Sequence, residues 1–259
     1  MTKIIKILLA LFLLGYSQSS FTQEWIRLYG VGQKGSPSSV INDYDDGFLI
    51  SGVVNLNKYI WIIKTDINGN IIWNKRFGNG VYNCWGRNVE KTNDGGSIIC
   101  GGWQKNNLFW DSYIIKLNTC GEIEWCNTLD TPDIYDFGYK VLPTPEGDFV
   151  LMSYFVNENP PSNTSLFKFN SSGNLIWHQY YPLDSVYYQD EISDFLVDTD
   201  GYLVTSSRYA PDSGTFWPKV MRSYFMKTDT AGIKQWDLIY GLNNHYYTMP
   251  WTTIKSSSG

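Results

Sequence analysis

Hydrophobic and polar residues alternate over short stretches along the chain after residue 23, and no stretch has the period of a helix. Short runs rich in Ile, Val, Tyr and Trp are separated by clusters of Asn, Asp and Gly, which is typical of antiparallel strands joined by hairpin turns. One set of four strands is predicted at residues 72–78, 86–92, 97–103 and 112–117. The pattern therefore predicts an all-β protein.

The strand pattern repeats with a fixed motif. A Lys near the end of one strand is followed by turn residues, a Gly and a Trp, and the Gly always lies four residues before the Trp. The four copies run from Lys64 to Trp73, from Lys116 to Trp125, from Lys168 to Trp177 and from Lys227 to Trp236. With Trp25 included, successive Trp residues are 48, 52, 52 and 59 residues apart. A period of about 50 residues is typical of propellers and solenoids.

A second turn, an acidic residue followed by Gly, recurs between the middle strands of each repeat. Its copies are Asp46-Gly47, Asp94-Gly95, Glu146-Gly147 and Asp200-Gly201. We expect the Gly to adopt the positive φ that such a turn requires. Repeats of four antiparallel strands favour a β-propeller, here with four blades and part of a fifth. A stacked β-solenoid is the alternative, although its coils are usually shorter than this repeat.

The repeat resembles the β-propeller-like repeats of secreted Bacteroidetes proteins, written Trp-x-x-x-Tyr-Gly, Asp-Gly-Gly-aromatic and Lys-x-Asp-x-x-Gly-x-x-x-Trp. The corresponding segments here run from Trp25 to Gly30, from Asp94 to Ser97 and from Lys64 to Trp73. The resemblance covers essentially all of residues 24–259 and implies a propeller-like fold and export. It implies little about activity, and the later copies depart from the pattern.

The N-terminus has the features of a secretory signal peptide. Lys3 and Lys6 precede an apolar run over residues 7–14, which is too short to span a bilayer, and a polar stretch follows. We expect residues 1–23 to be removed on export, leaving residues 24–259 as one repeat domain, secreted or at the cell surface and without a transmembrane segment. An uncleaved membrane anchor is the alternative. Removal changes the formal charge from −5 to −7, which makes nucleic acid and anionic membranes poor partners.

The four cysteines are Cys84, Cys100, Cys120 and Cys126, and they show no CxxC or Cys/His metal spacing. Export permits disulfides, but the 43 Trp, Phe and Tyr residues can form a core without them. Cys120 lies at a predicted turn and Cys126 along the returning strand, too far apart to pair. We expect no disulfide framework, no metal and no other cofactor.

The predicted fifth repeat is incomplete. Its first strand is expected at residues 236–241 and its second at residues 251–255, before a turn-like stretch at residues 256–259. We interpret the chain as a fragment of a longer reading frame, because natural sheets avoid an open edge. A short protein that dimerises, or that closes through its terminal strands, is the alternative.

The repeated motif residues are expected to be structural. The Trp residues at 73, 125, 177 and 236 should be buried between neighbouring blades, and Lys64, Lys116 and Lys168 should lie along the strands or bond to the next blade. The turn at Asp66 should be an Asx-turn rather than a calcium loop, because a calcium loop needs more oxygen ligands.

Antiparallel order places the acid–Gly turns and the Lys-to-Trp turns on one side of the blades and the longer, more variable loops on the other. Function concentrates in variable loops on a rigid scaffold. This long-loop side is rich in aromatic and acidic residues. The candidate ligand-binding residues on it are Trp85, Trp103, Trp110, Asp111 and Trp217.

Aromatic side chains beside carboxylates suit sugars and protein partners equally well. We predict an exported, non-catalytic binding or surface-interaction module, with a glycan or a protein as its partner. The alternative is a carbohydrate-active enzyme that uses two loop carboxylates. The carboxylates considered for it are Asp133, Asp136, Asp190 and Glu191. The two histidines, His178 and His245, stand in no Ser or Cys constellation.

Overall fold

The computed structural model describes residues 26–30, 32–104, 109–129, 135–156, 163–182, 189–210, 220–241 and 248–254. These ranges contain strands and no helix, which confirms the all-β prediction. Accordingly, no helix in them is long and apolar enough to cross a membrane. The predicted signal peptide, residues 1–23, and the candidate residue Trp217 lie outside the described residues.

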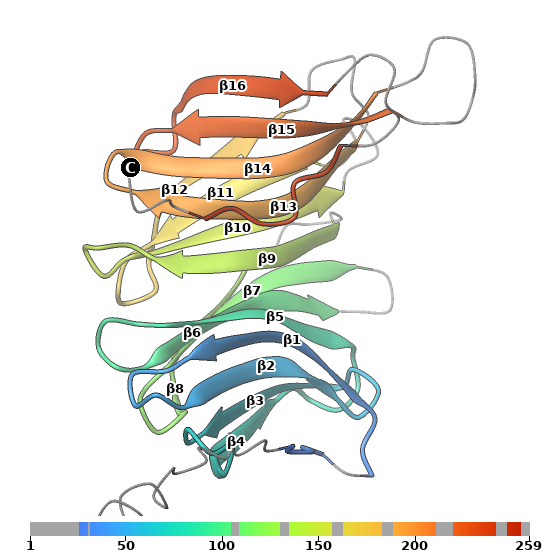
Figure 1. Cartoon of the computed structure of the whole chain (residues 1–259), viewed down its shortest axis with the longest axis vertical. Coiled ribbons are helices and arrows are strands. Elements are labelled where there is room, and N and C mark those ends of the chain that lie inside the picture. The colour runs from blue at the N-terminus through green and yellow to red at the C-terminus, as the bar shows by residue number, and fades with distance from the viewer. Residues whose placement is uncertain are drawn as a thin grey trace, which may run out of the picture.

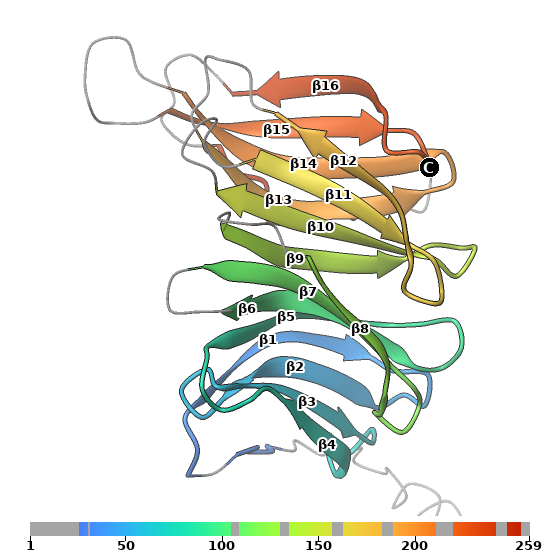
Figure 2. The same ribbon diagram turned by 180° about the vertical axis from the view of Figure 1, so that it is seen from behind.

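Sixteen strands in the described ranges form four sheets, each of four antiparallel strands in chain order (Figures 1 and 2). The first sheet contains β1 (Gly35–Asn42), β2 (Phe48–Val54), β3 (Tyr59–Thr65) and β4 (Ile71–Phe77). The second contains β5 (Cys84–Lys91), β6 (Ser97–Gln104), β7 (Trp110–Leu117) and β8 (Ile123–Leu129). The third contains β9 (Tyr135–Pro143), β10 (Phe149–Val156), β11 (Asn163–Phe169) and β12 (Leu175–Tyr181). The fourth contains β13 (Gln189–Asp198), β14 (Gly201–Ala210), β15 (Val220–Thr228) and β16 (Lys234–Tyr240).

The four sheets follow one another along the long axis of the molecule, with the first sheet at one end and the fourth at the other (Figure 1). Neighbouring sheets meet through their first strands. Strand β5 lies against β1 and β2, β9 lies against β5, β6 and β7, and β13 lies against β9, β10 and β11. Apolar side chains fill the space between sheets, as where Ile60 and Ile62 pack with Ile99 and Ile115. The number of four-stranded sheets thus equals the number of complete predicted repeats.

Each strand that carries the repeated Trp is the last strand of its sheet, so the prediction that it begins a blade was wrong. Strand β16, expected as the first strand of a fifth repeat, instead pairs with β15 and completes the fourth sheet. The reason is that the Lys-to-Trp segment is a tight hairpin. Its Lys and Trp lie directly opposite each other in all four sheets, as Lys64 and Trp73, Lys116 and Trp125, Lys168 and Trp177, and Lys227 and Trp236.

The turn inside this hairpin is an Asx-turn in every sheet. The Oδ1 atoms of Asp66, Asn118, Asn170 and Asp229 accept hydrogen bonds from the backbone N–H groups two and four residues later. The Gly that follows in each turn has a φ between 73° and 83°, in the left-handed region that Gly adopts most readily. These contacts confirm the Asx-turn interpretation.

The acid–Gly turn of the first sheet differs from the expected form. Gly95, Gly147 and Gly201 have positive φ. In the first sheet the residue with positive φ is Asp46, at 60°, and not Gly47. Asp tolerates this region better than most side chains. Gly47 is needed for space instead, because a Cβ there would lie 2.0 Å from the Thr65 carbonyl oxygen.

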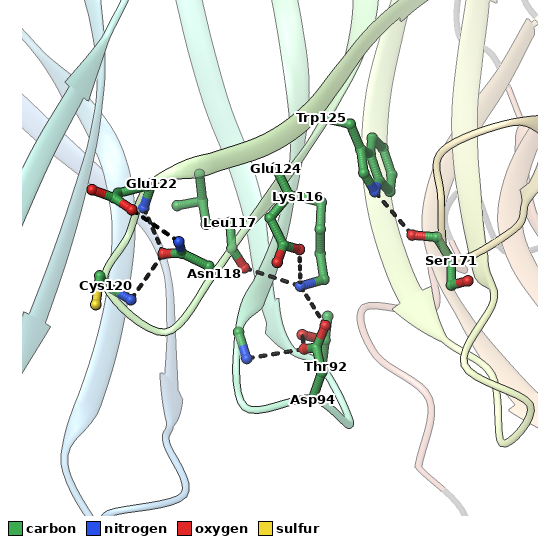
Figure 3. Close-up of polar contacts among 11 residues, drawn as sticks. Thr92, Asp94, Lys116, Leu117, Asn118, Cys120, Glu122, Glu124, Trp125 and Ser171 are labelled. Carbon is green, nitrogen blue, oxygen red and sulfur yellow. Dashed lines mark hydrogen bonds and ion pairs between the residues drawn. The ribbon is translucent and has the colours of Figure 1, made fainter.

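The repeated Lys binds the acidic turn of its own sheet. In the second sheet the buried Lys116 Nζ lies 2.8 Å from Asp94 Oδ2 and 2.9 Å from Glu124 Oε2 (Figure 3). Lys64, Lys168 and Lys227 make equivalent ion pairs within their own sheets. The alternative that these lysines bond to the next blade is therefore wrong. A buried ammonium needs an anion nearby, and the acidic turn of the same sheet supplies it.

The repeated Trp of each of the first three sheets packs against the turn Gly of the next sheet. A Cβ at Gly121 would lie 3.0 Å from the Trp73 ring, and one at Gly173 would lie 2.6 Å from the Trp125 ring. Gly232 has the same relation to the third of these Trp residues. Trp125 also donates its Nε1–H to the Ser171 carbonyl oxygen at 3.0 Å (Figure 3).

The predicted packing of Trp between sheets is confirmed, but the burial was overestimated. Trp73, Trp125 and Trp177 are half-buried, because each indole packs against a core cluster and also rests on a turn at the sheet edge. Trp236 is 49% exposed, and no turn of a further sheet covers it within the described residues.

All four cysteines, at positions 84, 100, 120 and 126, are free thiols. Cys84 and Cys100 are buried, whereas Cys120 and Cys126 are exposed. The expectation that Cys120 and Cys126 do not pair is confirmed.

Gly173→Ala should destabilise the protein more than Gly147→Ala. Both glycines have nearly the same φ, 83° and 88°, so an alanine costs about 1–2 kcal/mol of backbone strain at either position. Only at Gly173 would the methyl group also meet an indole, since nothing lies within 4 Å of a Cβ at Gly147. We expect an additional loss of about 1–3 kcal/mol, measured by urea denaturation. An equal loss in both variants would show that Trp125 does not press on this turn in solution.

Asp94→Asn should make the free energy of unfolding fall less steeply as the pH is lowered. Burial acts to raise the pKa of Asp94, but the hydrogen bonds from Lys116, Thr92 and the Gly96 N–H outweigh it and hold the pKa at about 2. The unfolded value is about 3.9, so the ionised group stabilises the folded state above about pH 4, and this contribution is lost as the pH falls toward 2.

The Asp94 side chain is 57% exposed, so solvent screening keeps this contribution below about 1 kcal/mol. Urea denaturation of both proteins at several pH values between 2 and 6 measures it. Curves that stay parallel over this range would contradict the assignment.

Candidate ligand-binding site

A cavity of about 600 Å³ lies between the second, third and fourth sheets, at the strand ends that join the long loops. Most of its lining is aromatic. The lining residues are Trp85, Trp110, Tyr135, Phe137, Tyr139, Tyr154 and Tyr209, together with Arg87 and Ile192. The structure therefore brings two of the predicted site residues, Trp85 and Trp110, to one cavity.

Trp110 lies among other aromatic rings. Its ring centroid is 5.8 Å from that of Phe137 and 6.4 Å from that of Tyr135. A glycine makes this approach possible, because a Cβ at Gly102 would lie 2.3 Å from the Phe137 ring and 3.0 Å from Trp110. Trp85 lies opposite Gly102 in the strand pairing and is 36% exposed. The cavity thus offers both a packed aromatic wall and an accessible indole.

Two lining residues, Arg87 and Tyr139, lie at β-bulges. In the first strand of each sheet the pairing register shifts and leaves one extra residue, namely Ser38, Arg87, Tyr139 or Ser193. A bulge redirects a side chain out of the alternation of the strand. In the second and third sheets the two bulged side chains meet, and the Arg87 guanidinium carbon lies 4.3 Å from the centroid of the Tyr139 ring.

Arg87 is the one charged side chain among the described residues that line the cavity. It is half-buried, and the described part of the chain provides no hydrogen bond or ion pair to its guanidinium. Burial raises the pKa of Tyr135, and the neighbouring Tyr154 raises it further. The cavity therefore combines aromatic faces, neutral hydroxyl groups and one cation.

Trp103 and Asp111 do not line this cavity. Successive residues of a strand point to opposite faces, so Asp111 cannot share the direction of Trp110. Asp111 is only 5% exposed. Trp103 packs on the apolar cluster between the first and second sheets.

The carboxylates considered for catalysis are also displaced from the cavity or undescribed. Asp136 lies between two lining residues of the same strand, so its side chain points to the opposite face. It is fully buried and accepts a hydrogen bond from the Ser112 backbone N–H. Asp133 and the side chains of Asp190 and Glu191 lie outside the described residues. The His178 ring stacks on Phe167 with centroids 4.1 Å apart, and His245 is not described. No group of three or more His, Cys, Asp or Glu able to hold a metal ion occurs in the described ranges.

Several residues that line the cavity were not among the predicted site residues. They are Arg87, Phe137, Tyr139, Tyr154 and Tyr209. One signal is present in the sequence: residues 86–87 and 138–139 each pair a Gly with a bulged residue at equivalent positions of two repeats. The bulge itself is not visible from the sequence, although alternation alone already puts Arg87 on the face of Trp85 and Tyr139 on the face of Phe137.

Two further cavities are less suited to a ligand. One of about 240 Å³ lies between residues 26–30 and the first sheet, where Tyr29 donates its hydroxyl to the Gly69 carbonyl oxygen at 2.8 Å. Another of about 350 Å³ lies between β12 and the fourth sheet, where the buried Arg208 lies over the Tyr224 ring. In both, several polar groups already bond to other parts of the chain, although Ser51 Oγ and Trp61 Nε1 beside the first cavity have no hydrogen-bond partner among the described residues.

No model of a known protein family matches this chain, and no curated protein matches it. Its function is therefore inferred from the geometry of the aromatic cavity.

Proposed function

We propose that the chain is an exported, non-catalytic binding module, built as a β-propeller, that holds a glycan in the aromatic cavity. The observation that carries this proposal is that Trp85 and Trp110 line the same cavity beside five other aromatic residues. Export is supported by the signal-like pattern of residues 1–23.

The propeller is supported by the identical way in which each sheet meets the next. In addition, residues 26–30 lie on the first sheet as β12 lies on the fourth: Tyr29 and Tyr181 donate their hydroxyls to the carbonyl oxygens of equivalent turn glycines at 2.8 Å and 2.7 Å. At the other end, the Thr253 N–H donates to Asp194 Oδ2 at 2.7 Å, beside β13.

These contacts support the interpretation of residues 26–30 as the last strand of a blade and of residues 248–254 as lying near the first-strand position of one. In a ring of radially packed sheets, the two positions belong to the same blade. We therefore take the sheets as successive blades, with both of these segments contributing to a further blade.

A glycan fits the chemistry of the cavity better than a protein surface does. Sugar rings lay their apolar C–H faces on aromatic rings, while phenol hydroxyls and backbone groups bond to the sugar hydroxyls. A cavity of about 600 Å³ lies within the usual range for small-ligand sites. Protein interfaces are broader, with a large buried core and a polar rim.

The enzyme alternative gains no support from the geometry. Glycoside hydrolysis requires two carboxylates placed on either side of the bond that is cleaved. None of the described residues that line the cavity is acidic. Asp136, which lies between the lining residues Tyr135 and Phe137, is fully buried. Its carboxylate accepts a hydrogen bond from the backbone of the second sheet.

Trp110→Ala and Trp85→Ala should each weaken glycan binding at least about tenfold, because a base or sugar stacked on an aromatic ring contributes roughly 1–3 kcal/mol. A glycan array followed by calorimetry on the best ligand measures this. Trp236→Ala is the matched control, since Trp236 does not line the cavity and is already 49% exposed.

Trp85→Ala tests whether lost binding is caused by misfolding. Trp85 is more exposed than Trp110, so its replacement leaves the core intact. Melting temperatures of all three variants are recorded beside the binding data. Absence of glycan binding by the parent protein, or equal binding by all three variants, would contradict the proposed function.

A further inference from the structure

We propose that the cavity selects an acidic glycan, whose sugar carboxylate is bound by the guanidinium group of Arg87. This proposal rests on the proposed function and adds the chemical class of the ligand. It is carried by the position of Arg87 in the cavity and by the lack of an anion for it among the described residues.

The charge of Arg87 is uncompensated within the described chain. The side chain is half-buried, every other described lining residue is uncharged, and its one close partner is the face of the Tyr139 ring at 4.3 Å. A partly buried charge without an acceptor is costly unless water or a ligand supplies one. A carboxylate entering the cavity would supply it.

The stacking on Tyr139 also prepares Arg87 for such a ligand. A guanidinium that lies over a ring keeps its N–H groups around its edge, where they remain available as donors. Arg then binds a planar carboxylate through two parallel hydrogen bonds, and little side-chain freedom is lost because the ring already restrains the group.

The repeats show that the fold does not require an arginine at this position. The equivalent bulged residues are Ser38 in the first sheet and Ser193 in the fourth, whereas the motif Lys, Gly and Trp is the same in all four repeats. Arg87 therefore serves the cavity and not the framework.

The overall charge makes the proposal specific. The chain has a formal charge of −5, so a polyanion gains no general attraction to its surface. Preference for an acidic over a neutral form of the same glycan would need a local cation, and Arg87 is the described one that faces the cavity.

The test compares glycans that differ only in the carboxylate. Polygalacturonate, alginate and hyaluronan are each paired with a carboxyl-reduced, neutral form, and binding is measured by calorimetry or affinity electrophoresis. The parent protein should bind the acidic form of at least one pair about ten- to a hundredfold more tightly, as expected for a charge-assisted hydrogen-bonded pair. This preference should weaken as the salt concentration rises.

Arg87→Gln and Arg87→Ser should reduce the preference for the acidic form to about one. The serine variant copies the first and fourth sheets, so it keeps a side chain that the fold accepts at this bulge. Arg87→Lys should retain only part of the preference, because it keeps the charge but loses the paired donors. Trp110→Ala should weaken binding of both forms.

Equal binding of the acidic and neutral forms, or a preference that survives in Arg87→Gln and Arg87→Ser, would overturn the acidic-ligand proposal. If the neutral forms still bind and that binding depends on Trp110, the proposed function stands on its own. Failure of all six glycans to bind would overturn the acidic-ligand proposal, and the separate glycan array would then decide the proposed function.

Discussion

The contact between a Trp at the end of one sheet and the turn Gly of the next sheet is the constraint on which the structure depends. Trp73 on Gly121 and Trp125 on Gly173 set how closely neighbouring sheets approach, because a side chain on either glycine would collide with the indole. With the sheets held in this way, their first strands lie side by side. The aromatic cavity is formed at the ends of those strands.

In each sheet the repeated Lys forms its ion pairs on one side only, the side of the acidic turn. Lys116 ties the acidic turn to the hairpin that presents Trp125, so the turn side is fixed by charge and hydrogen bonds (Figure 3). Among the described residues, the opposite side has no such repeated ion pair, and its side chains differ from sheet to sheet. Binding groups can therefore vary there without changing how the sheets pack, which is the usual arrangement of a rigid scaffold with variable ends.

The sequence predicted what depends on local rules and missed what depends on strand register. Strand positions, the Asx-turn at Asp66 and the Trp contacts follow from alternation, turn chemistry and the repeat. The grouping of strands into sheets was shifted by one, because antiparallel neighbours look alike on either side of a turn. Arg87 and Tyr139 were missed because site residues were expected only among the aromatic and acidic residues of the loops, whereas these two lie at bulges inside strands. At the site, Trp110 was recognised but its neighbour Asp111 points away.

Among the described residues, each sheet makes its main contacts with the sheets next to it in the chain, so the cooperativity of folding depends on a few interfaces between neighbouring sheets. Each joint between sheets is built from the same Trp and Gly, so the free energy of unfolding is shared among nearly equivalent links. A fault in a central link, such as that between Trp125 and Gly173, would divide the chain into two pairs of sheets that unfold in separate steps. The contact between Trp and Gly that recurs from sheet to sheet thus also sets the size of the unit that unfolds cooperatively.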